Sequence, residues 1–163
     1  MGTVTKSFEF DAAHRLLNED SKCANLHGHR YKVEVTFNYK EVSHTGYAVN
    51  FGEIKRICGA FIEKYFDHAT IVNAMDHALI DFIIQEASTF WTMGLCKYTD
   101  CNPTAENMAS EMFFCFSYLM DNENLHLKNI RLYETPTCWV DCENSPIFAE
   151  QFTDFLDAFK RMI

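Results

Sequence analysis

The sequence predicts an α+β domain in which an antiparallel four-stranded sheet is covered by helices on one face. Alternating apolar and polar residues, which are typical of strands with one buried face, fill two segments near the N-terminus and two between residues 127 and 142. Apolar residues at three- and four-residue spacing, which are typical of amphipathic helices, lie between and after the strand pairs. The resulting order β-β-α-α-β-β-α favours a sheet with its helices gathered on one side.

Size and composition favour a single domain spanning residues 1–163, with 48% hydrophobic and 23% charged residues. A net charge of −9 argues against a nucleic-acid ligand, because such binding depends on clustered Lys and Arg. No apolar run approaches the roughly 20 residues of a membrane-spanning helix. The N-terminal residues lack the apolar segment of a signal peptide, so we expect a cytoplasmic protein whose seven cysteines are reduced.

The first two strands are predicted over residues 3–11 and 28–39, joined by a long loop over residues 15–26. The apolar side of the second strand carries Tyr31, and the same period places His27 and His29 on that side. Pairing of the two strands as a hairpin would bring His14 beside these two histidines. Gly28 has no side chain, so a ligand or another strand can approach closely there.

The remaining elements follow from apolar stripes and from helix-start signals. A helix is predicted over Phe51–Phe66 and a shorter one over residues 78–90. Asn102 and Pro103 predict a third helix start, with Asn102 as N-cap and Pro103 in the first turn. Strands are predicted over Leu127–Glu134 and 137–142. A final amphipathic helix begins at Ser145-Pro146 and forms a C-terminal extension of about residues 146–163.

Three imidazoles with an open fourth position are the ligand set of a catalytic zinc. His14, His27 and His29 are therefore candidate ligands. The alternative is a structural role, since a lone histidine at a strand end is usually structural and a His-Gly-His motif alone is a weak signal.

Three further positions carry candidate chemistry. Cys23 lies in the polar loop, where Lys22 and a nearby zinc would favour the thiolate; an incidental thiol is the alternative. The pairs Asp67-His68 and Asp76-His77 both set a carboxylate beside a histidine, a pattern that suits proton transfer or a solvated helix boundary. Glu134 lies on the otherwise apolar face of its predicted strand, where a carboxylate either receives two N–H groups of a planar heterocycle or faces water.

Together these residues resemble the 6-pyruvoyltetrahydropterin synthase / 6-carboxytetrahydropterin synthase family. The matching motifs run in the same order from about Phe8 to Trp139: Phe10-Asp11-Ala12-Ala13-His14, Cys23-x-x-x-His27-Gly28-His29-x-Tyr31, Phe51-Gly52-Glu53-Ile54-Lys55, Asp67-His68, Asn102-Pro103-Thr104-Ala105-Glu106-Asn107 and Glu134-Thr135-Pro136-Thr137. The resemblance implies a tunnelling fold (T-fold), in which three subunits close an oligomeric barrel and two trimers stack as a homohexamer. It also implies an active site that lies between subunits.

The resemblance assigns a role to each candidate residue. It implies Zn²⁺ on His14, His27 and His29, and proton transfer by Cys23, Asp67 and His68. It implies that the substrate is held by Glu134, Thr104 and Glu106. Family order also selects Asp67-His68 over Asp76-His77, because the active pair follows the helix that begins at Phe51.

The Cys-x-x-x-His-Gly-His spacing resembles the 6-carboxytetrahydropterin branch of queuosine and 7-deazaguanine biosynthesis. The implied lyase reaction converts 7,8-dihydroneopterin triphosphate, a small-molecule pterin, to 6-carboxytetrahydropterin, acetaldehyde and triphosphate. The alternatives are 6-pyruvoyltetrahydropterin synthase, a non-catalytic zinc- and pterin-binding homologue, and a related aldolase or epimerase. The C-terminal extension passes the usual family end, and one hypothesis is that it covers a subunit seam.

Overall fold

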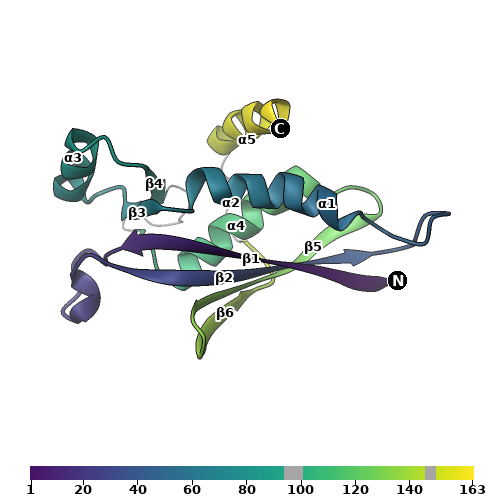
Figure 1. Cartoon of the computed structure of the whole chain (residues 1–163), viewed down its shortest axis with the longest axis horizontal. Helices are drawn as coiled ribbons and strands as arrows, with labels where there is room; N and C mark the ends of the chain where they lie inside the picture. The colour runs from purple at the N-terminus through teal and green to yellow at the C-terminus, as the bar shows by residue number, and fades with distance from the viewer. Residues whose placement is uncertain (94–100, 146–149) are drawn as a thin grey trace.

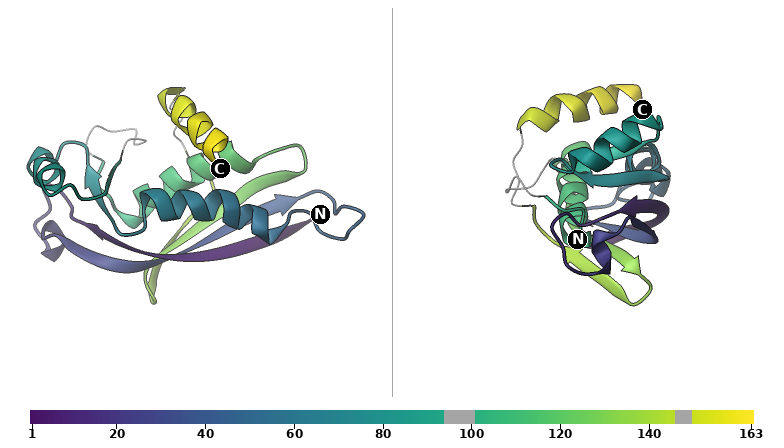
Figure 2. Two further views of the ribbon diagram at one scale, coloured as in Figure 1. Left: turned by 45° about the horizontal axis from the view of Figure 1, so that its top comes forward. Right: turned by 90° about the vertical axis from the view of Figure 1, so that its left-hand side faces the viewer.

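A computed structural model describes residues 1–93, 101–145 and 150–163 of the chain. The helices and strands lie in three layers: a sheet, helices over one of its faces, and a C-terminal helix outside those helices (Figures 1 and 2). In chain order the elements are β1 Gly2–His14, a 3₁₀ turn Lys22–Ala24, β2 His27–Tyr39, α1 Phe51–Ile54, a π-helical turn Lys55–Gly59, α2 Ala60–Tyr65, β3 Ala69–Asn73, α3 His77–Gln85, β4 Phe90–Met93, α4 Ala105–Met120, β5 Leu125–Thr135, β6 Cys138–Cys142 and α5 Glu150–Met162.

The sheet confirms the predicted strands and adds two more. Its order is β4-β3-β1-β2-β5-β6, and the four strands β1, β2, β5 and β6 pair antiparallel as predicted. The short strands β3 and β4 pair parallel beside the end of β1 and were not predicted. Residues 69–73 are almost entirely buried, so they show no alternation by which a strand could be recognised.

β1 and β2 form the longest pair of the sheet, with a register that runs from Gly2 opposite Tyr39 to His14 opposite His27. β1 therefore continues to His14 and does not end near Asp11 as predicted. The side chains of both strands that face the helices are buried or half-buried, and those of the other face are mostly polar. This alternation fixes the register, because a slip by one residue would turn the apolar set to water.

Two predicted helix boundaries need correction. α4 begins at Ala105 with Thr104 as its N-cap, so Asn102 is not the cap and Pro103 precedes the helix. The helix predicted over residues 78–90 ends at Gln85, because Phe90 starts β4. The helix predicted over Phe51–Phe66 is confirmed as one continuous run of α1, the π-helical turn and α2.

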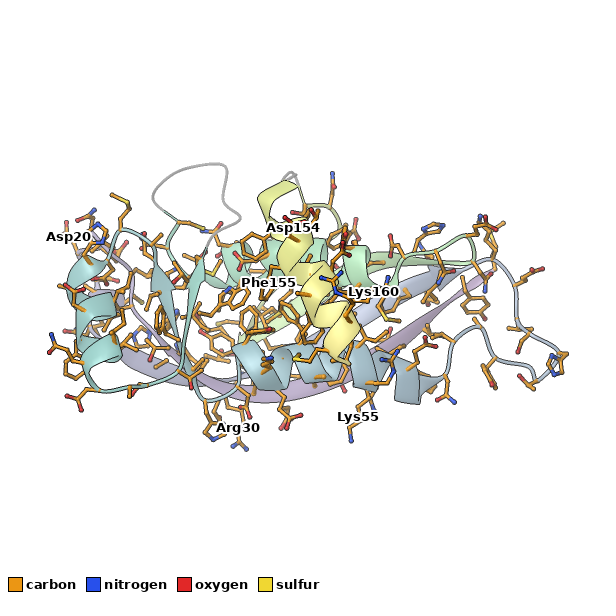
Figure 3. All side chains as sticks on the ribbon, turned by 90° about the horizontal axis from the view of Figure 1, so that it is seen from above. Asp20, Arg30, Lys55, Asp154, Phe155 and Lys160 are labelled. Carbon is orange, nitrogen blue, oxygen red and sulfur yellow. The ribbon has the colours of Figure 1, made fainter. Side chains whose placement is uncertain are left out.

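The predicted C-terminal helix is present as α5; its predicted start near Pro146 lies outside the described residues. It lies across the outer side of the helical layer (Figures 2 and 3). Leu156 and Phe159 are buried within this one chain, and the ring of Phe159 packs against Phe61 and Tyr65 of α2. The apolar side of α5 thus contributes to the core of the subunit, and that the helix also covers a subunit seam stays a prediction.

Five cysteines of the described residues are free thiols: Cys23, Cys58, Cys115, Cys138 and Cys142. Cys101 is disulfide-bonded, so the expectation of reduced cysteines throughout is wrong at this position. Across residues 1–93, 101–145 and 150–163, no helix combines the length and apolar character needed to cross a membrane.

Candidate active site

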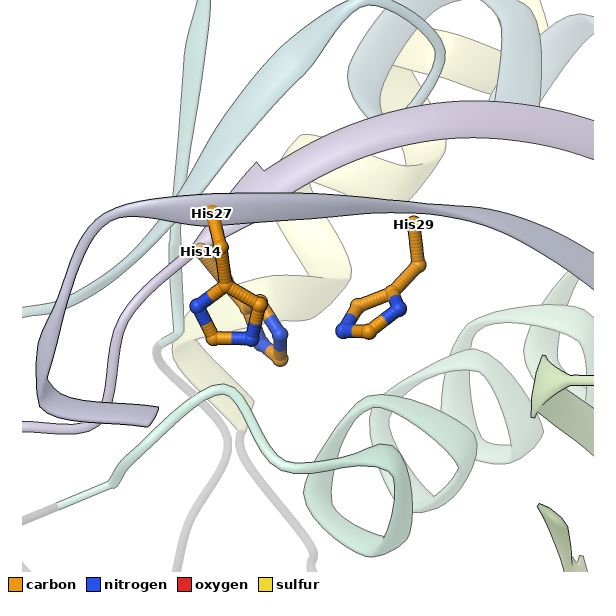
Figure 4. A group of neighbouring side chains, drawn as sticks. All are labelled: His14, His27 and His29. Carbon is orange, nitrogen blue, oxygen red and sulfur yellow. The ribbon is translucent and has the colours of Figure 1, made fainter. Parts of the chain in front are cut away.

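The three candidate metal ligands meet at one end of the β1–β2 pair. His14 lies opposite His27 in the register, and His29 follows two residues later on the same face of β2. One ring nitrogen from each residue falls within 4.8 Å of the others (Figure 4). A Cβ at Gly28 would lie 3.0 Å from the carbonyl oxygen of Ala12, so the close approach expected at this glycine is that of strand β1. This is a three-imidazole group on two paired strands.

Backbone carbonyls orient two of the three rings. Nδ1 of His14 lies 2.7 Å from the carbonyl oxygen of Pro103, and Nδ1 of His27 lies 2.7 Å from that of Asn25. Because a carbonyl oxygen only accepts, each Nδ1 carries the hydrogen, so Nε2 carries the lone pair that can bind a metal. Sequence reasoning missed both carbonyls, since neither involves a recognisable side chain.

His14 is buried, and burial lowers its pKa despite the opposing effect of the Pro103 carbonyl. The ring is therefore held neutral, which is the form that binds a metal. Three neutral imidazoles that leave a fourth position open fit a catalytic zinc. The donor set is consequently compatible with the implied Zn²⁺.

The histidines adjoin a pocket of about 300 Å³ lined by four of the other candidate residues. Its walls come from β1, the loop before β2, the start of α4 and the β5–β6 hairpin: His14, Leu16, Cys23, Thr104, Ala105, Glu106, Glu134, Cys138, Trp139 and Val140. The pocket thus brings two thiols and two carboxylates to the histidine group. The contribution of β6 was not expected, because nothing in the pattern of residues 137–142 marks a site.

Glu134 is the carboxylate nearest to the histidines. Its Oε1 lies 3.7 Å from Nε2 of His14 and 3.9 Å from Nε2 of His29, and about a third of its side chain is exposed. The buried hydroxyl of Tyr31 also reaches Nε2 of His14, at 3.4 Å. The free oxygens of Glu134 can therefore receive N–H groups of a ligand that enters the pocket beside the metal position.

Cys23 is a half-buried free thiol in the 3₁₀ turn Lys22–Ala24. Ser21 caps this turn by accepting a hydrogen bond from the Cys23 N–H. The Cys23 carbonyl accepts a bond of 2.8 Å from the Leu16 N–H, which closes the loop on itself. The loop thereby places Cys23 in the wall of the pocket.

The Asp67-His68 pair lies apart from this pocket. Asp67 Oδ2 is 3.0 Å from Nδ1 of His68, whose ring is largely exposed. Backbone bonds to Asp11 hold the pair: the Asp11 N–H donates to Asp67, and the His68 N–H donates to the Asp11 carbonyl. His68 adopts a positive φ of 56°, a conformation uncommon for a non-glycine residue. Within one chain, Cys23 and His68 therefore line different hollows.

The second pair, Asp76-His77, has a different role for its carboxylate. Asp76 is buried, caps α3 at the Leu79 N–H, and receives two hydrogen bonds of 2.6 Å from Arg15. These bonds from Arg15 hold the pKa of Asp76 below its usual value. Asp76 thus ties the end of β1 to α3, and its carboxylate is committed to that structural contact.

Comparison with known proteins gives consistent results. The family model of 6-pyruvoyl tetrahydropterin synthase matches residues 3–145. A protein of Rickettsia bellii named 6-carboxy-5,6,7,8-tetrahydropterin synthase is 36% identical over 84% of this chain and 96% of its own length. The protein of that name from Haemophilus influenzae is 35% identical over 88% and 98%.

Two solved structures show the same fold. An uncharacterized protein from Wolinella succinogenes, WS1659, matches with a TM-score of 0.74 and 19% identity over 88% of this chain and 98% of its own. The Caenorhabditis elegans 6-pyruvoyl tetrahydropterin synthase matches with a TM-score of 0.62 and 24% identity over 88% and 96%. The chain belongs to the 6-pyruvoyl tetrahydropterin synthase family.

Proposed function

We propose that this chain is a zinc-dependent 6-carboxy-5,6,7,8-tetrahydropterin synthase that converts 7,8-dihydroneopterin triphosphate to 6-carboxytetrahydropterin, acetaldehyde and triphosphate. The observation that carries the proposal is that the three-histidine group, through His14, adjoins a pocket lined by the Cys23 thiol and the Glu134 carboxylate. Relatives of that name, at 33–36% identity over 84% of the chain, support this reaction over others in the family.

The residues of the pocket divide the work between binding and proton transfer. His14, His27 and His29 hold Zn²⁺, which when bound supplies a Lewis acid that polarises substrate oxygens. Glu134 accepts two N–H groups from the edge of the pterin and so fixes the ring. Thr104 and Glu106, at the start of α4, line the same pocket and contact the bound substrate. Cys23 exchanges a proton with the substrate carbon next to the polarised oxygen.

The second proton carrier comes from a neighbouring subunit. In the described part of the chain, β6 pairs only with β5, and β1 has β3 beside it only from Ala12 to His14. The outer strand β6 and the part of β1 before Ala12 thus each leave an open edge, and antiparallel pairing of β6 with the next subunit's β1 would extend the sheet into a barrel. This closure underlies the proposed homohexamer of two stacked trimers.

Closure in this way would bring the separated groups together. The β6 residues Cys138–Val140 line the metal pocket. The open part of β1 lies beside Asp67, since Phe8, Glu9 and Asp67 line one hollow. A β6–β1 seam therefore places the Asp67-His68 pair of one subunit next to the pocket of its neighbour. His68, oriented by Asp67, would then exchange a proton on the substrate face opposite Cys23.

Product analysis tests the reaction. The zinc-loaded protein would be incubated with 7,8-dihydroneopterin triphosphate and the products identified by mass spectrometry. 6-Carboxytetrahydropterin with acetaldehyde is the expected result. 6-Pyruvoyltetrahydropterin would assign the chain to the reaction named for the Caenorhabditis elegans neighbour. Unchanged substrate, with zinc bound, would favour a binding protein.

Mixed assemblies test whether the two proton carriers come from different subunits. Cys23→Ala and His68→Ala chains, each inactive alone, would be co-expressed with different tags and purified as mixed oligomers. If the carriers belong to adjacent subunits, about a quarter of the sites in a random equal mixture combine an intact Cys23 with an intact His68. If both belong to one chain, every site lacks one group and the mixture stays inactive.

The finer parts of the proposal follow from this assignment. A 6-carboxytetrahydropterin product places the enzyme in queuosine and 7-deazaguanine biosynthesis, in the cytoplasm. Metal analysis of the purified protein checks the identity of the ion, and light scattering checks the hexamer.

A further inference from the structure

The loop that carries Cys23 is held at its base by a side chain from a distant part of the sequence. The Leu17 N–H donates to Oδ1 of Asn102 at 2.7 Å, and Nδ2 of Asn102 donates to the Leu17 carbonyl at 2.9 Å. The amide thus pairs with both polar groups of one backbone residue, as a neighbouring strand would. This pair of hydrogen bonds between Asn102 and Leu17, called the clamp below, fixes Leu17 in both distance and orientation.

The bonds within the loop transmit this constraint to the thiol. Leu16, next to Leu17, donates its N–H to the Cys23 carbonyl at 2.8 Å. Leu16 also lines the metal pocket together with Cys23. A shift of Leu17 would therefore move Leu16 and, through that hydrogen bond, the turn that presents the thiol.

The other end of the clamp is itself fixed. Oδ1 of Asn102 accepts a second bond from Nδ2 of the buried Asn73, at 3.0 Å. The Asn102 carbonyl accepts a bond of 2.8 Å from the side chain of Asn107 on α4. The next residue, Pro103, holds the ring of His14 through its carbonyl. One short segment thus sets the position of both the Cys23 loop and a metal ligand.

We propose that Asn102 is a positioning residue, which sets the distance of the Cys23 thiol from the metal-binding histidines. The inference rests on the proposed function for its catalytic consequence. Asn102 is absent from the lining of the pocket, so its effect passes through the loop and not through substrate contact. It also explains why the residue before Pro103 is not the helix cap: Thr104 caps α4 and leaves the Asn102 amide free for Leu17.

The test compares Asn102→Ala with Asn50→Ala in the zinc-loaded oligomer. Asn50 is a matched control, because its side chain also accepts a backbone hydrogen bond, at the start of α1 and away from the loop. We expect Asn102→Ala to keep its zinc and to lower kcat about ten- to hundredfold with little change in KM, since misplacement of a catalytic group acts on the chemical step. Asn50→Ala should match the wild type in all three properties.

A second readout does not depend on turnover. The rate at which iodoacetamide alkylates Cys23, followed by peptide mass spectrometry, should change severalfold in Asn102→Ala and not in Asn50→Ala. Asn102→Asp keeps the acceptor for the Leu17 N–H and loses the donor, so an intermediate rate is expected; it also serves if the alanine variant fails to fold. If the wild type lacks synthase activity, the proposed function fails, but the alkylation rate of Cys23 still tests whether Asn102 positions the thiol.

Two results would overturn the inference. If iodoacetamide alkylates Cys23 in Asn102→Ala at the same rate as in the wild type, the loop holds the thiol without the clamp. Loss of zinc in proportion to kcat would show that Asn102 supports the metal site through Pro103 and not the thiol.

Discussion

Truncation of Phe159 in α5 distinguishes a helix that completes the subunit core from one that covers a subunit seam. Phe159 is 2% exposed within a single chain, and its ring centroid lies 5.2 Å from that of Phe61 and 5.8 Å from that of Tyr65. The partner rings belong to α2, which itself packs on the sheet, so the space left by the ring cannot close easily. Phe159→Ala should therefore create a cavity rather than a local collapse.

The expected cost is that of a large core truncation, about 3–5 kcal/mol in the free energy of unfolding. For a domain of this length each kcal/mol corresponds to a change of about 2–4 °C in Tm, so a decrease of roughly 8–16 °C is expected for a cost near 4 kcal/mol. Phe82→Ala is the matched control, because Phe82 on α3 is 56% exposed and its loss should change stability by less than about 1 kcal/mol.

Thermal unfolding followed by circular dichroism, at one fixed subunit concentration, measures the first effect, and light scattering at 20 °C measures assembly. We expect Phe159→Ala to melt early but to keep the wild-type oligomeric mass and the zinc content. The reasoning is refuted if Tm stays within about 1 °C of the wild type while the mass falls, since that pattern places Phe159 between subunits.

Three further predictions address the site and its support. His27→Ala should lose zinc, whereas Cys23→Ala should keep zinc and lose turnover; metal analysis of both proteins checks this, and full zinc in His27→Ala would contradict the ligand assignment. Glu134→Gln should weaken pterin binding about ten- to hundredfold, because one carboxylate acceptor becomes an N–H donor; calorimetric titration with a pterin measures this, and an unaltered Kd would count against it. Asp76→Asn should lower stability at neutral pH. The pKa of Asp76 is depressed by Arg15, so the ionised carboxylate stabilises the fold above its ordinary pKa of about 4 and loses this effect as the pH falls through the folded value. Denaturant unfolding at several pH values should therefore show the variant and the wild type converging in acid, and a constant difference down to pH 3 would show that Arg15 contributes nothing.

The sequence predicted the central strands because each has one buried and one exposed face. In β2 the alternation that starts at Tyr31 fixes the register and, read backwards, the face of His27 and His29. The same logic fails for β3, where residues 69–73 are buried on nearly every side and so carry no period. It also fails to choose the cap of α4, since Asn102 and Thr104 are both good caps and only the contact of Asn102 with Leu17 decides between them.

Local sequence could not separate Asp67-His68 from Asp76-His77, because each is a carboxylate followed by a histidine near a helix end. The structure separates them by what the carboxylate contacts. Arg15 occupies both oxygens of Asp76, whereas Asp67 bonds the Asp11 backbone with one oxygen and leaves the other beside His68.

Even so, a single chain leaves His68 apart from the Cys23 pocket. In the proposed function, the chemistry therefore depends on how the open edges of β1 and β6 are paired, and no pattern of residues along one chain records that pairing. If the site is shared between subunits as proposed, dilution that separates the subunits should abolish turnover before any helix or strand unfolds, with zinc still bound to each chain.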